Sequence, residues 1–504
     1  MDRREFLQRT GLLGGGVLLG GPTLLGGRRA RGEDEPRGLL EGSAKDAPID
    51  TIVVAMMENR SFDHYFGWLA DDERYLERGK ERYGRRFHVD GDQRQEFAAP
   101  DGAVYETAPW LTQTGEPNPY RGCGHLDPGH QWDQGRAQRD FGFLGAGAAN
   151  DIYALSYYER DALPFLGELA REFTVFDQWH ASVLGPTYPN RAYLHAAQSG
   201  GYKVNVVPAD TAGYPFASIW DRLGAAGVPA KYYGTDLPVI ALWGNRLLAY
   251  NNPIDAYFTD AAAGTLPNVV FVDPAFLTGN RTDDHPHADI RAGQRFLRDV
   301  FQAFAQSKHW KRGAFIVTYD EWGGFFDHVP PPILPDDLAN PVDADNFGQA
   351  GFRVPAVIAS PYARRGFVDH HLYDHTSVLR FLEWRFLGAP ARGPGKDGDS
   401  WFLTSRDRNA RNLGASLLGE EPDRDVGFDL DVPIGEPSPI CTQDGGPPLP
   451  PPTPPVPVTP ATVPAPAAIE KHSFEVAMDE GWFERVGYKV RPSAMAREWA
   501  GTST

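Results

Sequence analysis

Two pairs of adjacent polar residues stand where a metal ion could bind. Glu58 and Asn59 follow one short apolar run, and Asp320 and Glu321 follow another. Adjacent carboxylates at the end of a strand repel one another unless a proton or a cation lies between them. Carboxylate and amide oxygens suit a divalent cation such as Ca²⁺, and Zn²⁺ also accepts carboxylates. Together, the two pairs predict a site for a divalent metal ion whose identity stays open.

Thr187 is the candidate nucleophile. It lies in the segment GPTYPNR, in which Pro189 and Asn190 predict the start of a helix. Backbone N–H groups at a helix N-terminus favour phosphate oxygens, and a hydroxyl that also binds the cation becomes acidic enough to attack. Taken alone, the segment favours an ordinary threonine at a helix cap.

Histidines supply candidate proton carriers. His130 lies in GHLDPGHQWD and His285 in DDHPHAD, and both are predicted to bind a non-bridging phosphate oxygen or to protonate a leaving oxygen. His328, which follows the sequence FFD, is a further candidate for phosphate binding. His287 is expected at the surface.

The elements that must position these residues follow an alternating pattern. Between residues 49 and 418, short continuous apolar runs alternate with amphipathic stretches, which predicts an α/β sandwich with a mostly parallel sheet. Ligands of such sheets bind beyond the carboxyl ends of the strands. Helices are predicted over 286–306, with Asp284 as a possible N-cap, and over 376–386. The predicted strands are 51–56, 173–176, 228–233, 268–272, 314–318 and 354–359.

Both ends of the chain differ from this central region. Arg3 and Arg4, followed by a short apolar and Gly-rich run, resemble a twin-arginine signal; a retained anchor is the alternative. We therefore expect contact with the twin-arginine export machinery and a periplasmic, cell-surface or secreted location. The predicted division is a signal peptide (1–32), a linker (33–48), a catalytic domain (49–420), a Pro-rich linker (421–470) and a C-terminal tail (471–504).

Composition excludes several classes of protein. The formal net charge of −18 argues against a general nucleic-acid binder and against strong docking on an anionic membrane. The chain has two cysteines, Cys123 and Cys441, which are too few for a thiolate zinc cluster. A disulfide between them and two separate thiols are both compatible with the sequence.

Five motifs together resemble one family. ENRSFDHYFG, GPTYPNR, DDHP, YDEWGGFFDHV and YDHTSVLRFLEWRF are similar, in this order, to motifs of the bacterial phosphoesterase family. That family holds phosphatidylcholine-hydrolysing phospholipases C and related acid phosphatases. The resemblance runs from about residue 50 to about residue 387 and implies an alkaline-phosphatase-like α/β/α sandwich. It also implies metal ligands at Glu58, Asn59, Asp320 and Glu321, Thr187 as the metal-linked nucleophile, phosphate contacts from His130 and His285, and Tyr233 and Asp236 as additional candidates.

The resemblance implies a function for these residues. We expect an exported, metal-dependent phospholipase C that acts on phosphatidylcholine-like phospholipids through a phosphorylated Thr187. An acid phosphatase acting on phosphomonoesters is the alternative, and a non-catalytic secreted binding protein is the third interpretation. The chain has a Pro-rich segment and a short tail where haemolytic relatives carry β-rich repeats, so we do not expect membrane lysis.

Overall fold

The computed structural model describes residues 37–112, 119–277, 281–340, 342–393, 401–420, 422–438, 472–490 and 493–502. The predicted signal peptide and the Pro-rich stretch 445–468 lie outside these ranges, as does Cys441. Cys123 is disulfide-bonded. Within the described ranges, no helix combines the length and apolar character needed to cross a bilayer.

An eight-stranded sheet forms the centre of the fold, in the order β13-β6-β12-β11-β1-β10-β8-β9. Only β12 (Ala356–Ala359), among these eight strands, runs antiparallel to its neighbours, so the predicted mostly parallel sheet is confirmed. The other strands are β1 (Thr51–Met57), β6 (Thr174–Phe176), β8 (Ala230–Gly234), β9 (Asn251–Pro253), β10 (Val269–Asp273), β11 (Gly313–Tyr319) and β13 (Phe367–Asp369).

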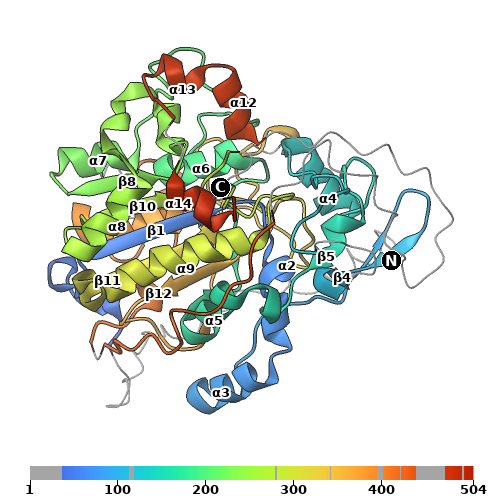
Figure 1. Cartoon of the computed structure of the whole chain (residues 1–504), viewed down its shortest axis with the longest axis horizontal. Helices are drawn as coiled ribbons and strands as arrows, with labels where there is room; N and C mark the ends of the chain where they lie inside the picture. The colour runs from blue at the N-terminus through green and yellow to red at the C-terminus, as the bar shows by residue number, and fades with distance from the viewer. Residues whose placement is uncertain are drawn as a thin grey trace, which may run out of the picture. The chain divides into compact units, whose positions relative to one another are not determined.

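Helices cover the sheet. Every residue of β1 and β11 is buried, which explains their continuous apolar sequences. The helices α5 (Pro164–Glu172), α8 (Ile254–Ala263) and α9 (Ile290–Gln306) pack together over the face turned to the viewer in Figure 1. A second packed group consists of α6 (Thr187–Ala196), α7 (Ile219–Ala225) and α10 (Thr376–Leu382).

Two predicted helix starts are corrected by the structure. The long helix α9 is capped by Asp289, whose side chain accepts the N–H of Arg291, and not by Asp284. Asp284 has a positive φ of 72° and accepts a hydrogen bond of 2.6 Å from the Tyr319 hydroxyl instead. Helix α6 begins at Thr187, two residues before the predicted start, because proline is tolerated in the first turn of a helix.

The segments on either side of the central region pack on it. From residue 37 onward, the predicted linker 33–48 belongs to the folded body, since the N–H of Leu39 donates to the carbonyl of Leu417 over 2.8 Å. The tail forms α12 (Ser473–Asp479), α13 (Trp482–Arg485) and α14 (Ala494–Trp499). Helix α14 lies against α9 (Figure 1). The remaining α-helices are α2 (Phe62–Phe66), α3 (Glu73–Tyr83), α4 (Trp132–Phe141) and α11 (Ser405–Asn409).

Candidate active site

The four predicted metal ligands meet at the carboxyl ends of two adjacent parallel strands. Glu58 and Asn59 follow β1, while Asp320 and Glu321 follow β11, and all four side chains are fully buried. The backbone N–H of Asn59 donates to Asp320 Oδ1 over 3.2 Å, and that of Arg60 donates to the Glu321 carbonyl over 3.1 Å. The two loops therefore form one structural unit.

Gly323 permits this close approach of the loops. Asn59 has a left-handed φ of 61°, which asparagine tolerates better than most residues. Gly323 also has a positive φ, of 63°, and a Cβ atom there would lie 2.2 Å from the Asn59 carbonyl oxygen. The neighbouring loop therefore occupies the space that a side chain at position 323 would need.

The buried oxygens of this unit fit a divalent cation. Asn59 Oδ1 and Glu321 Oε1 are buried without a hydrogen-bond partner. Burial raises the pKa of Glu58 to about 7, and burial together with the charge of Glu58 raises the pKa of Asp320 to about 8. Burial and the charge of Asp320 hold the pKa of Glu321 well above its ordinary value. A bound cation would satisfy the open acceptors and favour the ionised carboxylates.

Helix α6 begins at Thr187 and contacts this cluster through Arg191. Thr187 is its first residue and is 2% exposed. Arg191 lies one turn later on the same face, because residues four apart in a helix are neighbours. Arg191 Nη2 lies 3.0 Å from Glu58 Oε1, and Arg191 Nε lies 3.3 Å from Asp320 Oδ2. The face of α6 that carries Thr187 is therefore the face turned to the predicted metal ligands.

His130 borders the same cluster. Its Nδ1 lies 2.8 Å from the Pro128 carbonyl, so Nδ1 carries the proton and donates, and Nε2 keeps a lone pair. Nε2 lies 3.5 Å from Asn59 Nδ2 and 3.9 Å from Glu321 Oε1. The neutral ring can accept a proton at Nε2 and, once charged, can donate it to a phosphate or leaving oxygen.

His285 has the same arrangement. Its Nδ1 lies 3.1 Å from the carbonyl of Pro286, which again leaves the lone pair on Nε2. That nitrogen lies 3.5 Å from Asp127 Oδ2, and the two histidine rings are 6.2 Å apart between centroids. Burial holds the pKa of His285 well below its ordinary value, which favours the neutral ring. The structure thus brings His130 and His285 together.

A cavity of about 300 Å³ reaches this part of the site, with Asp127, His130 and His287 among its lining residues. His287 is only 3% exposed, and its Nε2 lies 3.0 Å from the His125 carbonyl, which corrects the expectation of a surface position. Among the candidate site residues named so far, His130 is the one that lines this cavity.

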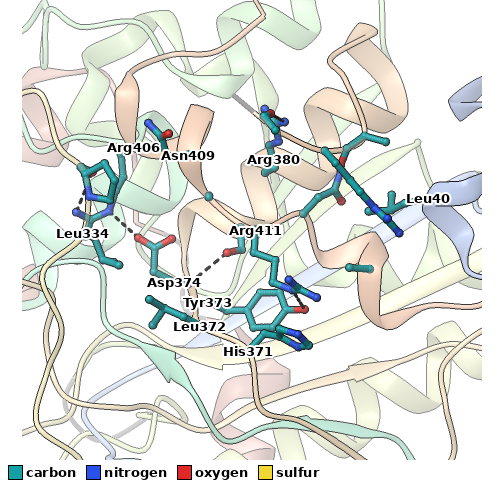
Figure 2. A pocket seen from close by; sticks show the side chains of 18 residues that line it. Leu40, Leu334, His371, Leu372, Tyr373, Asp374, Arg380, Arg406, Asn409 and Arg411 are labelled. Carbon is teal, nitrogen blue, oxygen red and sulfur yellow. Dashed lines mark hydrogen bonds and ion pairs between the residues drawn. The ribbon is translucent and has the colours of Figure 1, made fainter. Parts of the chain in front are cut away.

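A larger cavity, of about 700 Å³, is a separate feature (Figure 2). Its wall carries the ion pair between Asp374 and Arg406, with a distance of 2.8 Å. Of the described residues that line it, none is a predicted site residue. Asp374 precedes His375, whose Nε2 lies 2.6 Å from the Asp320 carbonyl. One residue of the cavity wall, Asp374, is therefore the direct neighbour in sequence of the residue that contacts the Asp320 carbonyl.

Three predicted phosphate contacts have other partners in the structure. The Tyr233 hydroxyl donates to Asp260 Oδ2 over 2.6 Å. Side chains alternate along a strand, and it is the preceding residue, Tyr232, that reaches Asp273, a partner of Arg191. The Asp236 carboxylate accepts the backbone N–H groups of residues 276 and 277. His328 Nδ1 lies 2.6 Å from Asp63 Oδ2. The partners of these three side chains are not among the four predicted metal ligands.

Sequence reasoning missed two side chains that contact Glu58, Arg191 and His472. Arg191 belongs to the recognised segment GPTYPNR, and its place four residues after Thr187 was an available signal. His472 comes from the tail, belongs to no recognised motif, and contacts Glu58 Oε2. Ligand atoms of Glu58, His285 and His472 all lie within 4.8 Å of one another.

The chain is similar to several known proteins. The sequence model described as the Phosphoesterase family matches residues 49–387. Non-specific phospholipase C1 of Arabidopsis thaliana is 32% identical over 399 residues, which cover 71% of this chain and 69% of that protein. Phospholipase C B of Mycobacterium tuberculosis is 30% identical over 407 residues, which cover 68% and 74%. A solved alkaline phosphatase superfamily protein from Vibrio parahaemolyticus is 13% identical and covers 54% of this chain and 71% of its own, with a TM-score of 0.30.

Proposed function

Because the chain belongs to the Phosphoesterase family, whose members are hydrolytic enzymes, we propose that it is a metal-dependent phospholipase C acting on phosphatidylcholine-like phospholipids. The observation that carries this proposal is the buried set of oxygen ligands beside the N-terminus of α6, where Thr187 lies. Relatives named as phospholipases C, 30% and 32% identical to this chain, support the choice of a phosphodiester substrate.

The proposed reaction requires a divalent metal ion. Glu58, Asn59, Asp320 and Glu321 would hold it. When bound, a divalent cation supplies charge neutralisation and lowers the pKa of a nearby hydroxyl. The all-oxygen ligand set is compatible with a hard cation such as Ca²⁺, and the histidines beside it extend the choice to Zn²⁺.

Each residue of the site has its own role in the proposed reaction. The Thr187 oxygen attacks phosphorus in line, and the bond from phosphorus to the diacylglycerol oxygen breaks. A neutral His130 or His285 accepts the proton of the Thr187 hydroxyl at Nε2 and passes it to the oxygen of the leaving alcohol. The backbone N–H groups that begin α6 stabilise the phosphate oxygens. Water then hydrolyses the phosphorylated Thr187.

An acid phosphatase is the alternative, because the same groups could hydrolyse a phosphomonoester. The test is hydrolysis of p-nitrophenylphosphocholine and of p-nitrophenyl phosphate, each with and without a chelator. We expect preference for the phosphocholine diester, loss of activity on chelation, and recovery when metal is added back. Preference for the monoester would support the phosphatase, and no turnover of either substrate with metal present would support a binding protein.

We also propose export by the twin-arginine route, which rests on the sequence of residues 1–27 alone. Replacement of both Arg3 and Arg4 by lysine should retain the protein in the cytoplasm of a host that has this machinery. Unchanged export of the double variant, measured by cell fractionation, would contradict the proposal.

A further inference from the structure

His472 reaches the candidate active site from the far end of the chain. It is the N-cap of α12, it is 1% exposed, and its Nε2 contacts Glu58 Oε2. Its ring stacks on Phe276 with centroids 5.2 Å apart. A residue that follows the Pro-rich segment is therefore in direct contact with a predicted metal ligand.

The hydrogen bonds of the ring define what His472 can do there. The backbone N–H of Phe474 donates to His472 Nδ1 over 3.1 Å, so Nδ1 holds a lone pair. A neutral ring then carries its proton on Nε2 and donates it to Glu58. A histidine that binds metal through one nitrogen almost always donates through the other. His285 has that arrangement, and His472 has the opposite one.

Glu58 is consequently held from two directions. Arg191 of α6 approaches Oε1, and His472 of α12 approaches Oε2. Asp283 Oδ2 lies 3.7 Å from His472 Nε2, on the side of the DDHP segment. Because the Glu58 carboxylate is fully buried, these neighbours determine its orientation.

The start of the tail is anchored to the elements that build the site. The Tyr188 hydroxyl donates to the Ser473 carbonyl over 2.8 Å, and the Tyr188 ring lies 4.8 Å from that of Phe474. Arg281 Nη2 lies 2.8 Å from Glu475 Oε2. Tyr188 is adjacent to Thr187, and Arg281 precedes the DDHP segment, so the tail links the helix of the nucleophile to that segment.

We propose that His472 is a positioning residue, through which the C-terminal tail completes the metal site by fixing the Glu58 carboxylate in its ligating orientation. The inference rests on the proposed metal role of Glu58, and it does not depend on which phosphate ester is hydrolysed. Hydrogen bonds to metal ligands of this kind typically contribute 10- to 100-fold to metal affinity.

Two substitutions separate this role from the role of His472 as a helix cap. His472→Gln keeps an N–H donor at about the position of Nε2. His472→Asn keeps an acceptor for the N–H of Phe474, but its side chain is too short to reach Glu58. Zinc affinity is measured for both by competition with a chromogenic chelator, and thermal unfolding is measured on the metal-free proteins.

The proposal predicts opposite orders in the two measurements. His472→Asn should weaken zinc binding about 10- to 100-fold while its metal-free unfolding temperature stays near that of the wild type. His472→Gln should bind zinc within a few-fold of the wild type, with the larger loss of stability. If both variants bind zinc like the wild type, or if both lose the same affinity, His472 does not act through its N–H donor and the inference is overturned.

Asp320→Asn, which alters a proposed ligand itself, shows which proposal has failed. If Asp320→Asn binds zinc weakly and His472→Asn binds it normally, the metal site stands and the positioning role is overturned. If Asp320→Asn binds zinc like the wild type, the proposed metal site fails, and the role of His472 fails with it.

Discussion

Arg191 Nη2 lies 3.0 Å from Glu58 Oε1, and both side chains are almost completely buried. The same guanidinium lies 3.3 Å from Asp320 Oδ2 and 3.4 Å from Asp273 Oδ2. One arginine therefore faces three carboxylates at the carboxyl ends of β1, β10 and β11. It supplies part of the positive charge that the cluster needs before a metal ion binds.

Removal of this arginine should destabilise the metal-free protein strongly. At pH 9, which lies above the raised pKa values of Glu58 and Asp320, Arg191→Gln leaves buried carboxylates without compensation. The expected loss of unfolding free energy is about 3–5 kcal/mol, measured by urea denaturation. Added zinc should restore part of it.

Arg246→Gln is the matched control for Arg191→Gln. Arg246 pairs with Asp221 at 2.5 Å, but both side chains are about one-third exposed. Its removal should cost less than about 1 kcal/mol. Equal losses of unfolding free energy in the two variants would show that the buried ion pairs of Arg191 contribute no more to stability than the partly exposed pair of Arg246.

Thr187→Ala should abolish turnover of the phosphodiester while the protein stays folded. The side chain is small and lies in the first turn of α6, so we expect a loss of at most about 1 kcal/mol in unfolding free energy. Thr187→Ser keeps a hydroxyl and should keep part of the activity. Trapping of a phosphorylated enzyme by acid quench, followed by mass spectrometry, checks the intermediate; near-normal turnover by Thr187→Ala would remove Thr187 from the mechanism.

Gly323→Ala should weaken metal binding by displacing a loop. The new Cβ would lie 2.2 Å from the carbonyl oxygen of Asn59, so the loop that carries two proposed ligands must move. Gly102→Ala is the matched control, because Gly102 also has a positive φ, of 86°, but nothing lies within 4 Å of the added Cβ. In both variants, alanine must adopt a positive φ, which lowers the stability of the fold. Zinc affinity should fall in Gly323→Ala alone, and equal affinity in the two variants would contradict this.

The sequence predicted the strands and the residues that follow them well, because a buried parallel strand has a continuous apolar sequence and its carboxyl end is the place where ligands bind. Glu58 and Asp320 do follow β1 and β11 directly. The sequence could not say which tyrosine of β8 faces the site, because neighbouring residues of a strand point to opposite faces: Tyr232 contacts Asp273 and Tyr233 contacts Asp260. Asp284 was misjudged as a cap because its backbone conformation has no signal in the pattern of apolar residues.

His472 could not be predicted by the same reasoning. It follows a Pro-rich segment, and no local pattern indicates that a residue 414 positions after Glu58 contacts it. The family motifs gave no help either, since the family match ends at residue 387. Contacts between distant segments depend on how the whole chain packs, and here the packing brings the tail to helix α6.

The pH dependence of stability should reveal the ion pairs of His328. Burial lowers the pKa of His328, but hydrogen bonds to Asp63 and Asp90 outweigh burial and raise the pKa to about 10. A histidine whose pKa is higher in the folded protein stabilises the fold fully below its unfolded pKa of 6.5, and this contribution disappears as the pH rises toward 10. The difference in unfolding free energy between the wild type and His328→Gln should therefore be largest at pH 6 and should shrink by pH 10. Asp90→Asn, which removes one partner, should lower the pKa of His328 measured by NMR titration. If the difference in unfolding free energy between the wild type and His328→Gln stays constant from pH 6 to pH 10, the contacts with Asp63 and Asp90 do not raise the pKa of His328.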